Sequence, residues 1–287
     1  MTLDPLLTGK AHAATIKEKV LKRNNVLKAL SGTSWGKDKE TLLTTFKATA
    51  QSLLNYCCPI WTPGLSETNW NELQISQNAC LRTSTGCVKM SSADHLHTET
   101  KNMPVKEHCS MISKQFLLAT TKPDHPNHID LNEPPPPRIM KETLTTRFSS
   151  DIASLVPESG SNTSTYKSGL QIIHTRSVQN VINNQSNNPI LQEPAPPIHK
   201  SESELPRQAR VTLAQLRSGY SSHLNQYLAR INPTKYSEKC PDCNLAPHSI
   251  NHLFTCPEKP TNLTPRSLWT EPTAAAKFLG LTTDGIG

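Results

Sequence analysis

The chain has 287 residues, of which 35% are hydrophobic, and it carries 23 prolines against 11 glycines. So few apolar residues argue against a single compact core that spans the whole length. The net charge of +7 and the pI near 9.0 favour a polyanionic partner, of which nucleic acid is the commonest, although an ordinary solvated surface explains the charge as well.

Residues 10–30 form the first predicted helix. Its apolar residues recur at helical spacing among lysines and arginines, which would form a basic outer face. Solubility explains this basic face at least as well as contact with phosphates does. Gly32 follows at a position where glycine can adopt the left-handed conformation that ends a helix. The apolar positions are Ile16, Val20, Leu27 and Leu30, and the basic candidates for phosphate contact are Lys17, Lys22, Arg23 and Lys28.

Further helices are predicted over residues 37–55, over residues 66–85 and from Pro104 onward. Pro104 suits the first turn of a helix, where its missing N–H costs nothing. Short loops between these helices predict a small antiparallel bundle over residues 1–121. In its last helix we expect these residues to face inward: Val105, Cys109, Ile112, Phe116 and Leu117.

Residues 122–204 differ in character, because proline clusters and polar tracts replace the helical periodicity. Such a segment buries too little apolar area to offset its ordering entropy, so it is predicted to be a mostly disordered, proline-rich linker. A tetraproline, Pro134 to Pro137, is a candidate ligand for an SH3-like protein partner, and a plain spacer is the simpler interpretation.

Helical periodicity returns at Leu205 and predicts a helical hairpin that extends to about Ile231. Three of its arginines are candidates for phosphate contact: Arg207, Arg210 and Arg217. Two short helices are predicted near the C-terminus, over residues 265–269 and 274–279. The predicted fold class is therefore mainly α, with an N-terminal bundle, a linker and, over residues 205–287, a hairpin joined to a small module.

That module contains the pattern Cys240-x2-Cys243-x8-His252-x3-Cys256. Three thiolates and one imidazole are a ligand set that suits tetrahedral Zn²⁺, and a helix after Ile250 would place His252 and Cys256 one turn apart. His248 is the alternative imidazole. Four protein ligands leave no open position on the metal, so the predicted Zn²⁺ site is structural and not catalytic.

The N-terminal residues have neither a long apolar segment nor a basic leader, and no apolar run in the chain approaches the length of a membrane span. Five cysteines outside the module follow no disulfide framework, namely Cys57, Cys58, Cys80, Cys87 and Cys109. We therefore expect an intracellular protein of the cytoplasm or nucleus, with reduced thiols and no membrane partner.

Several landmarks of the chain resemble the C-terminal part of reverse transcriptases of non-LTR, jockey-like retrotransposons. They are Leu30-Ser31-Gly32, Trp35-Gly36, Tyr56, Pro59-Ile60-Trp61, Pro63, Gln77-Asn78, Leu81-Arg82, Thr85-Gly86-Cys87, His125-Pro126-Asn127-His128 and Gln215-Leu216-Arg217-Ser218-Gly219. The family usually has glycine after the tyrosine, where this chain has Cys57. The resemblance implies a helical thumb that grips the template–primer duplex, with Arg82 as a further basic candidate, followed by a Cys-Cys-His-Cys module.

Polymerase catalysis needs paired carboxylates that hold two metal ions, and the chain contains no Asp-Asp dipeptide. We therefore expect no enzyme but a nucleic-acid-binding fragment without the catalytic palm, which would bind RNA or single-stranded DNA with low specificity. One alternative is a zinc-stabilised protein-interaction module on a proline-rich tether. Another is a decayed element without function. If Phe254 were exposed it could stack on bases, whereas packing inside its own module is the simpler expectation.

Overall fold

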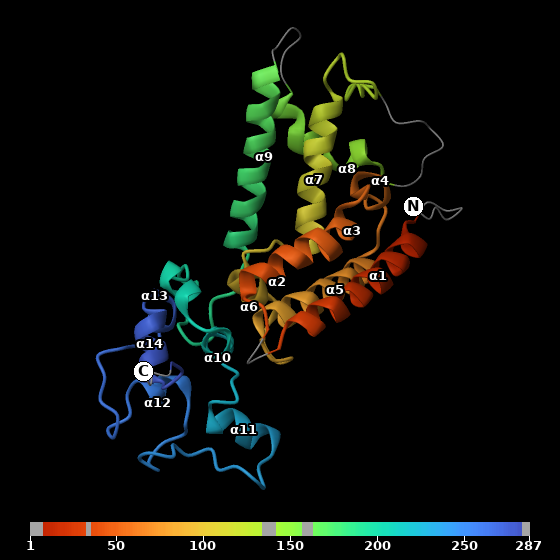
Figure 1. Cartoon of the computed structure of the whole chain (residues 1–287). Coiled ribbons are helices and arrows are strands. Elements are labelled where there is room, and N and C mark those ends of the chain that lie inside the picture. Colours follow the sequence, from red (N-terminus) through yellow and green to blue (C-terminus); the bar gives the residue numbers. More distant parts are fainter. Residues whose placement is uncertain (1–7, 33–35, 134–141, 157–162, 283–287) are drawn as a thin grey trace. The chain divides into compact units, whose positions relative to one another are not determined.

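The computed structural model describes residues 8–32, 36–133, 142–156 and 163–282 (Figure 1). These residues are mainly helical, which confirms the predicted fold class. Within the same ranges there is no β-strand, and strand-like pairing is limited to an isolated antiparallel bridge between Lys239 and Pro247. The tetraproline, Pro134 to Pro137, lies outside the described residues.

The chain divides into two compact units. Unit 1 consists of Met1–Asn24, Phe46–Ala79 and Met103–Asn184, and unit 2 consists of Asn25–Thr45, Cys80–Asn102 and Gln185–Gly287. Each unit therefore draws on three separate stretches of the chain, whereas the domains predicted from the sequence are consecutive.

The helical elements assigned mainly to unit 1 are α1 (Lys10–Leu30), the π-helical turn η1 (Lys47–Gln51), α3 (Ser52–Asn55), α4 (Cys58–Trp61), α5 (Glu67–Thr85), α7 (Val105–Thr120), α8 (Leu144–Ile152), η2 (Ala153–Leu155) and α9 (Thr163–Asn183). Those assigned mainly to unit 2 are α2 (Lys39–Phe46), α6 (Ala93–Thr100), η3 (Lys200–Glu204), α10 (Arg207–Arg217), α11 (Asn225–Ile231), α12 (Ile250–Leu253), α13 (Ser267–Thr270) and α14 (Pro272–Phe278). The bounds of α1 are those predicted.

An aromatic cluster holds the N-terminal part of unit 1 together. The ring of Trp61 meets His12 edge-on, with centroids 5.3 Å apart, and lies 6.5 Å from the ring of Trp70. Its Nε1–H donates to the carbonyl oxygen of Tyr56 (2.9 Å). Cys57, the next residue, has φ of 52°, in the left-handed region that glycine adopts without strain. The chain thus keeps a glycine-type backbone where it carries a cysteine.

Helices α7, α8 and α9 lie side by side and form the second core of unit 1 (Figure 1). Gly169 of α9 is part of this contact, because a Cβ atom there would lie 2.8 Å from Cδ2 of Leu118. A side chain at this position would require Leu118 to move. The buried members of this core are Met111, Leu117, Leu118, Phe148, Ile152, Tyr166 and Ile173.

Two expectations for this region need correction. Residues 122–204 are predicted to be a mostly disordered linker, but α8 and α9 lie within them and bury Phe148 and Ile173. Their polar composition is compensated by packing on α7. Phe116, predicted to face inward, is 39% exposed, because α7 turns Leu117 and Leu118 toward the core instead.

Unit 2 encloses a core that joins α10 to the short C-terminal helices. Its buried members are Leu205, Ala209, Leu213, Leu216, Leu224, Ile250, Phe254, Leu268, Trp269, Ala275 and Ala276. Residues before Leu205 join this core as well, since the backbone N–H of His199 donates to the carbonyl oxygen of Trp269 (2.9 Å) and Ile190 packs against the cluster. The last part of the predicted linker is therefore also ordered.

Candidate metal centre

The first half of the metal centre is a tight turn that carries Cys240 and Cys243. The backbone N–H of Cys240 donates to the carbonyl oxygen of Ala246 (2.8 Å), and that of Asn244 donates back to the carbonyl oxygen of Cys240 (3.0 Å). Asn244 has φ of 55°. Asparagine tolerates this left-handed conformation better than other residues with a side chain, so it closes the turn in place of glycine. The turn brings two thiols to one side of the loop.

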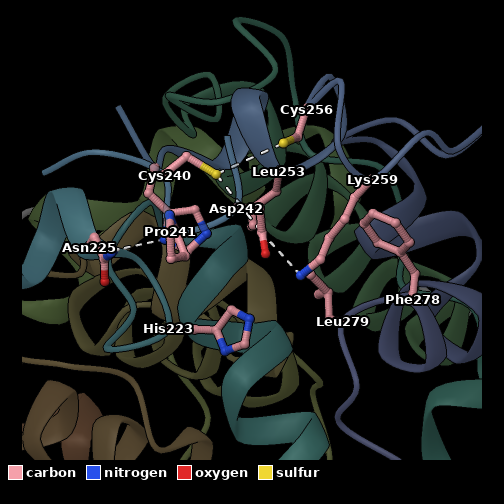
Figure 2. Close-up of a pocket in the computed structure, with 11 residues that line it drawn as sticks. His223, Asn225, Cys240, Pro241, Asp242, Leu253, Cys256, Lys259, Phe278 and Leu279 are labelled. Atoms are coloured by element: carbon pink, nitrogen blue, oxygen red, sulfur yellow. Dashed lines mark hydrogen bonds and ion pairs between the residues drawn. The ribbon is translucent and has the colours of Figure 1, made fainter. Parts of the chain in front are cut away.

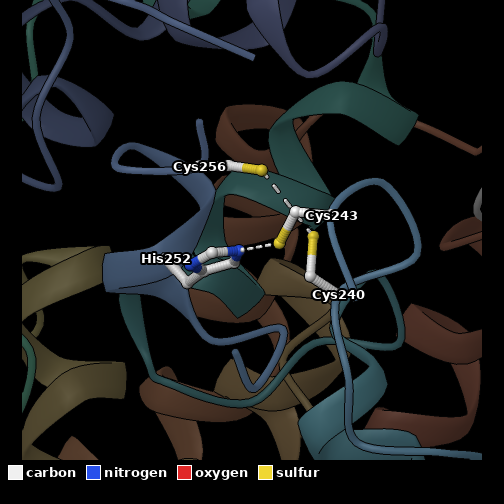
Figure 3. A group of neighbouring side chains, drawn as sticks. All are labelled: Cys240, Cys243, His252 and Cys256. Atoms are coloured by element: carbon white, nitrogen blue, oxygen red, sulfur yellow. Dashed lines mark hydrogen bonds between the residues drawn. The ribbon is translucent and has the colours of Figure 1, made fainter. Parts of the chain in front are cut away.

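The second half is the single turn of helix α12 and the residues that follow it. Ser249 caps this helix, because its side-chain oxygen accepts a hydrogen bond from the backbone N–H of His252 (3.3 Å). The cap fixes the start of the helix, which carries His252 and ends at Leu253, three residues before Cys256. Nε2 of His252 lies 3.2 Å from Sγ of Cys243, and Sγ of Cys256 lies 3.9 Å from Sγ of Cys240 (Figure 3).

The four side chains that the sequence predicts as ligands thus meet in one place. One ligand atom from each of Cys240, Cys243, His252 and Cys256 lies within 4.8 Å of all the others, which is close enough to hold a metal ion. Cys240 and Cys256 are buried, and the other two are partly exposed. Burial of thiols at this spacing, without a disulfide, fits a set of metal ligands.

The surroundings of Cys243 and Cys256 shift the pKa values of their thiols in opposite directions. The backbone N–H of Leu245 donates to Sγ of Cys243 (3.5 Å), and this and further hydrogen bonds lower the pKa of that thiol to about 7. Burial raises the pKa of the Cys256 thiol. Thiolates bind metals and thiols do not, so Cys243 is closer than Cys256 to its metal-binding form in the free protein.

His248 does not belong to the group of ligands. It is only 6% exposed, and its Nδ1 accepts a hydrogen bond from the backbone N–H of Asn225 (3.1 Å). This contact attaches the start of α11 to the loop between Cys243 and α12. Of the two imidazoles considered, the structure brings His252 to the cysteines and gives His248 a separate structural contact.

Helix α12 connects the ligands to the core of unit 2. Ile250 and Phe254 are buried in that core, and the ring of Phe254 stacks on Phe278 of α14, with centroids 5.8 Å apart. Phe254 is therefore unavailable to stack on bases, in agreement with the simpler expectation. Helix α12 and the residue that follows it therefore supply both a candidate ligand, His252, and two core residues, so a bound metal would hold the same segment that the core holds.

A cavity of about 280 Å³ opens beside the ligands (Figure 2). The sulfurs of Cys240 and Cys256 form part of its wall, and the carboxylate of Asp242 pairs with Nζ of Lys259 (3.1 Å) at its edge. Asp242 and Lys259 line the cavity together, so its wall carries charges of both signs.

A second polar group lies buried in unit 2, centred on Arg217. Its guanidinium is fully buried and pairs with Glu99 (3.0 Å) and with Glu202, while its Nε–H donates to the carbonyl oxygen of Leu268 (2.9 Å). Nζ of Lys39 lies 2.9 Å from a carboxylate oxygen of each glutamate. Charges this deeply buried are retained only when they are paired.

The electrostatics of this group follow from its burial. Burial alone would raise the pKa of Glu99, but the charges of Arg217 and Lys39 outweigh it and bring this pKa down to about 2. Glu99, Glu202 and Lys39 were not singled out from the sequence, because they lie far from Arg217 along the chain. No local pattern marks them, and only their folded positions show the pairing.

The prediction that the three arginines of the hairpin contact phosphates needs correction. Arg217 is fully buried, and Arg210, which is 5% exposed, pairs with Glu40. The guanidinium of Arg207 donates to the carbonyl oxygen of Gly32 (3.1 Å). Arg82 likewise donates to the carbonyl oxygen of Ser91 (3.1 Å). Arg210 and Arg217 therefore cannot reach phosphates, and the other two have part of their donors engaged within the protein.

The basic candidates on α1 are more accessible. Lys17 pairs with Glu72 (3.4 Å) and Lys22 with Glu18 (2.6 Å). Arg23 and Lys28 are exposed, and within the described part of the chain neither has an ion-pair partner. Of the eight basic residues proposed from the sequence, these two are the freest to contact a phosphate group.

Comparison with known proteins adds no identification. No protein-family model, no curated protein and no solved structure significantly matches the chain. Among the described helices, none has both the length and the apolar character needed to cross a membrane.

Proposed function

We propose that the chain is a zinc-dependent nucleic-acid-binding protein, related to the C-terminal part of non-LTR retrotransposon reverse transcriptases. The convergence of Cys240, Cys243, His252 and Cys256 is the observation that carries the proposal. Zinc is the expected metal because three thiolates and an imidazole form a soft ligand set that excludes Mg²⁺ and Ca²⁺. The ion would organise unit 2 and would not act in catalysis.

The fit of zinc rests on the residues around it. Zinc would replace the hydrogen bonds and thiol contacts that now join the turn at Cys240 to α12, and it would neutralise part of the charge of three thiolates. Native mass spectrometry of the whole chain is expected to show one equivalent of Zn²⁺. A protein purified without any metal, and unable to take up Zn²⁺, would contradict the metal assignment.

Nucleic-acid binding is supported by charge and accessibility. The net charge of +7 gives long-range attraction to a polyanion, and Arg23 and Lys28 present free cations on α1. The left-handed backbone at Cys57 occurs where the resembled family has glycine, which adds local support to the relationship. We therefore expect phosphate contacts to provide most of the affinity, with little sequence preference.

Salt titration tests the proposal. A fluorescent single-stranded RNA should bind at low salt, with the logarithm of its affinity falling linearly with the logarithm of salt concentration. The double variant Arg23→Gln/Lys28→Gln should reduce this slope by about 1.4, because each residue would neutralise about one phosphate and each phosphate of a single strand contributes about 0.7. Lys167→Gln removes an exposed charge from α9 and serves as the control, with an unchanged slope. Absence of binding at low salt would overturn the proposed function.

A further inference from the structure

Unit 2 contains another cavity, of about 260 Å³, between the end of α10, helix α11 and the start of α12. Its lining combines an aromatic residue, apolar residues, amides and a cation. The residues that matter here are Tyr220, Leu224, Gln226, Arg230, Ile250 and Asn251. The volume lies just below the range of about 300–1,000 Å³ typical of small-ligand sites, so the cavity suits one small planar group.

The charge of this cavity sets it apart from the cavity beside the cysteines. No acidic residue lines it among the described parts of the chain, and its charged lining residue is Arg230. Arg230 is exposed and, across the described ranges, has no ion-pair partner. The cavity beside Cys240 and Cys256 is lined by the paired charges of Asp242 and Lys259, whereas Arg230 makes this one favour an anion at its rim.

The backbone at the end of α10 gives the cavity its open side. Gly219 has φ of 83°, and no atom lies within 4 Å of the place where its Cβ would be. The next residue, Tyr220, is held by a T-shaped contact with Tyr227 of α11, with ring centroids 6.0 Å apart. An aromatic residue packed against a second ring thus stands next to open backbone at the entrance.

We infer that this cavity binds a single nucleotide unit of a single-stranded nucleic acid, an inference that rests on the proposed function. The base would lie against Tyr220, Leu224 and Ile250, because aromatic and apolar faces stack on any base. The amides of Gln226 and Asn251 would meet the donors and acceptors at its edge, and each amide offers both kinds of group. Arg230 would contact the adjoining phosphate.

The metal centre should control this cavity. Asn251 immediately precedes the ligand His252 in α12, and Ile250 belongs to both the cavity and the core. Loss of the metal would release α12 from the turn that carries Cys240, and one wall of the cavity would move with it. Nucleotide binding at this place should therefore require the metal.

Two variants of the whole, zinc-loaded chain test the inference with the same fluorescent RNA. Tyr220→Leu should weaken binding about tenfold through loss of stacking. Arg230→Gln should weaken it severalfold and lower the salt slope by about 0.7. Lys235→Gln is the matched control, since it removes one exposed charge just after α11 but does not line the cavity, and it should affect affinity less than Arg230→Gln.

Mononucleotides separate this inference from the function on which it rests. Nucleoside 5′-monophosphates should shift the backbone amide resonances of Gly219, Tyr220 and Asn251 in the zinc-loaded chain, and should shift them less in Tyr220→Leu. RNA binding that is salt-dependent but equal in both variants and the control would overturn the cavity assignment and leave the function standing. If RNA did not bind and mononucleotides caused no shifts, both would be overturned. Shifts without RNA binding would support the cavity alone.

Discussion

Units 1 and 2 are both helical, but different forces hold them together. The core formed by α7, α8 and α9 in unit 1 is apolar and aromatic, and it buries Leu117 and Phe148. Unit 2 combines its apolar core with a buried charge cluster around Arg217 and with the group at Cys240 that could hold a metal ion. Hydrophobic packing is insensitive to pH and chelators, whereas paired charges respond to pH and bound metals respond to both pH and chelators. The two units should therefore respond differently to the same perturbation.

The largest difference should come from the metal ligands. Cys256→Ser removes one of the four ligands, and structural zinc contributes about 10–16 kcal/mol of apparent binding free energy in isolated zinc-finger peptides. We expect bound Zn²⁺ to fall well below one equivalent and amide hydrogen exchange to accelerate in α12. The exchange of α7 should not change. Cys57→Ser, outside the ligand group, should retain the metal, and equal zinc content in both variants would refute the ligand assignment.

The buried charge cluster should give the next largest effect. Arg217→Met leaves Glu99 and Glu202 buried without their main partner, which typically costs about 3–5 kcal/mol. Arg266→Gln breaks the exposed pair with Glu193 and should cost less than about 1 kcal/mol. Chemical denaturation, with hydrogen exchange of the amides of unit 2 as the readout, measures the loss of unfolding free energy in both variants. Similar costs for the two would show that the Arg217 cluster is not buried.

The pH dependence of the same cluster has a defined sign. The pKa of Glu99 is lowered from its ordinary value of 4.5 to about 2, so its charge stabilises the folded state above pH 4.5. This contribution is lost as the pH falls from 4.5 toward 2. The difference in unfolding free energy between the wild type and Glu99→Gln should therefore narrow over that interval. The Cys240 group is the same in both proteins, so its own pH dependence cancels in the difference. A difference that stays constant between pH 5 and pH 2 would contradict the pairing of Glu99 with Arg217.

The stability of unit 1 should not depend on the metal. Leu117→Ala creates a cavity in the core formed by α7, α8 and α9 and should cost about 2–5 kcal/mol. Hydrogen exchange in α9 reports this loss, and it should be the same with and without a zinc chelator. A cost that depends on the metal would show that the two units do not differ in the way described.

The smallest effect concerns the turn at the metal centre. Asn244→Ala places a residue with a Cβ atom at a φ of 55°, which costs about 1–2 kcal/mol. Zinc affinity should fall about tenfold. Asn244→Gly should bind zinc at least as tightly as the wild type, because glycine adopts this conformation without strain. Equal affinities for all three would mean that the turn does not limit metal binding.

Local patterns predicted part of this structure from the sequence. The amphipathic spacing of Ile16, Val20 and Leu27 predicted α1 with its observed bounds, because one apolar stripe defines one helix. The convergence of the four candidate ligands was likewise predictable, since their spacing lies within 17 residues and encodes a turn followed by a helix. In both cases the information is contained in a short stretch of the chain.

The remainder depended on distant contacts. The polar tracts around helix α9 predict a disordered segment, yet α9 packs on α7 and buries Tyr166 and Ile173. From the sequence, Arg217 is a candidate for phosphate contact on the surface of the hairpin. In the structure it is buried, and its charge is balanced by Glu99 and Glu202 from other parts of the chain. Such tertiary compensation leaves no signal in local composition or spacing.

The most direct test of metal-dependent nucleic-acid binding is the affinity for single-stranded RNA at low salt, measured on one sample before chelation, after chelation and after Zn²⁺ is restored. We predict that binding weakens strongly when the metal is removed and recovers when it returns, because the ion organises α12 and the adjoining surface of unit 2. An affinity that does not change through this cycle would contradict the role assigned to the metal centre.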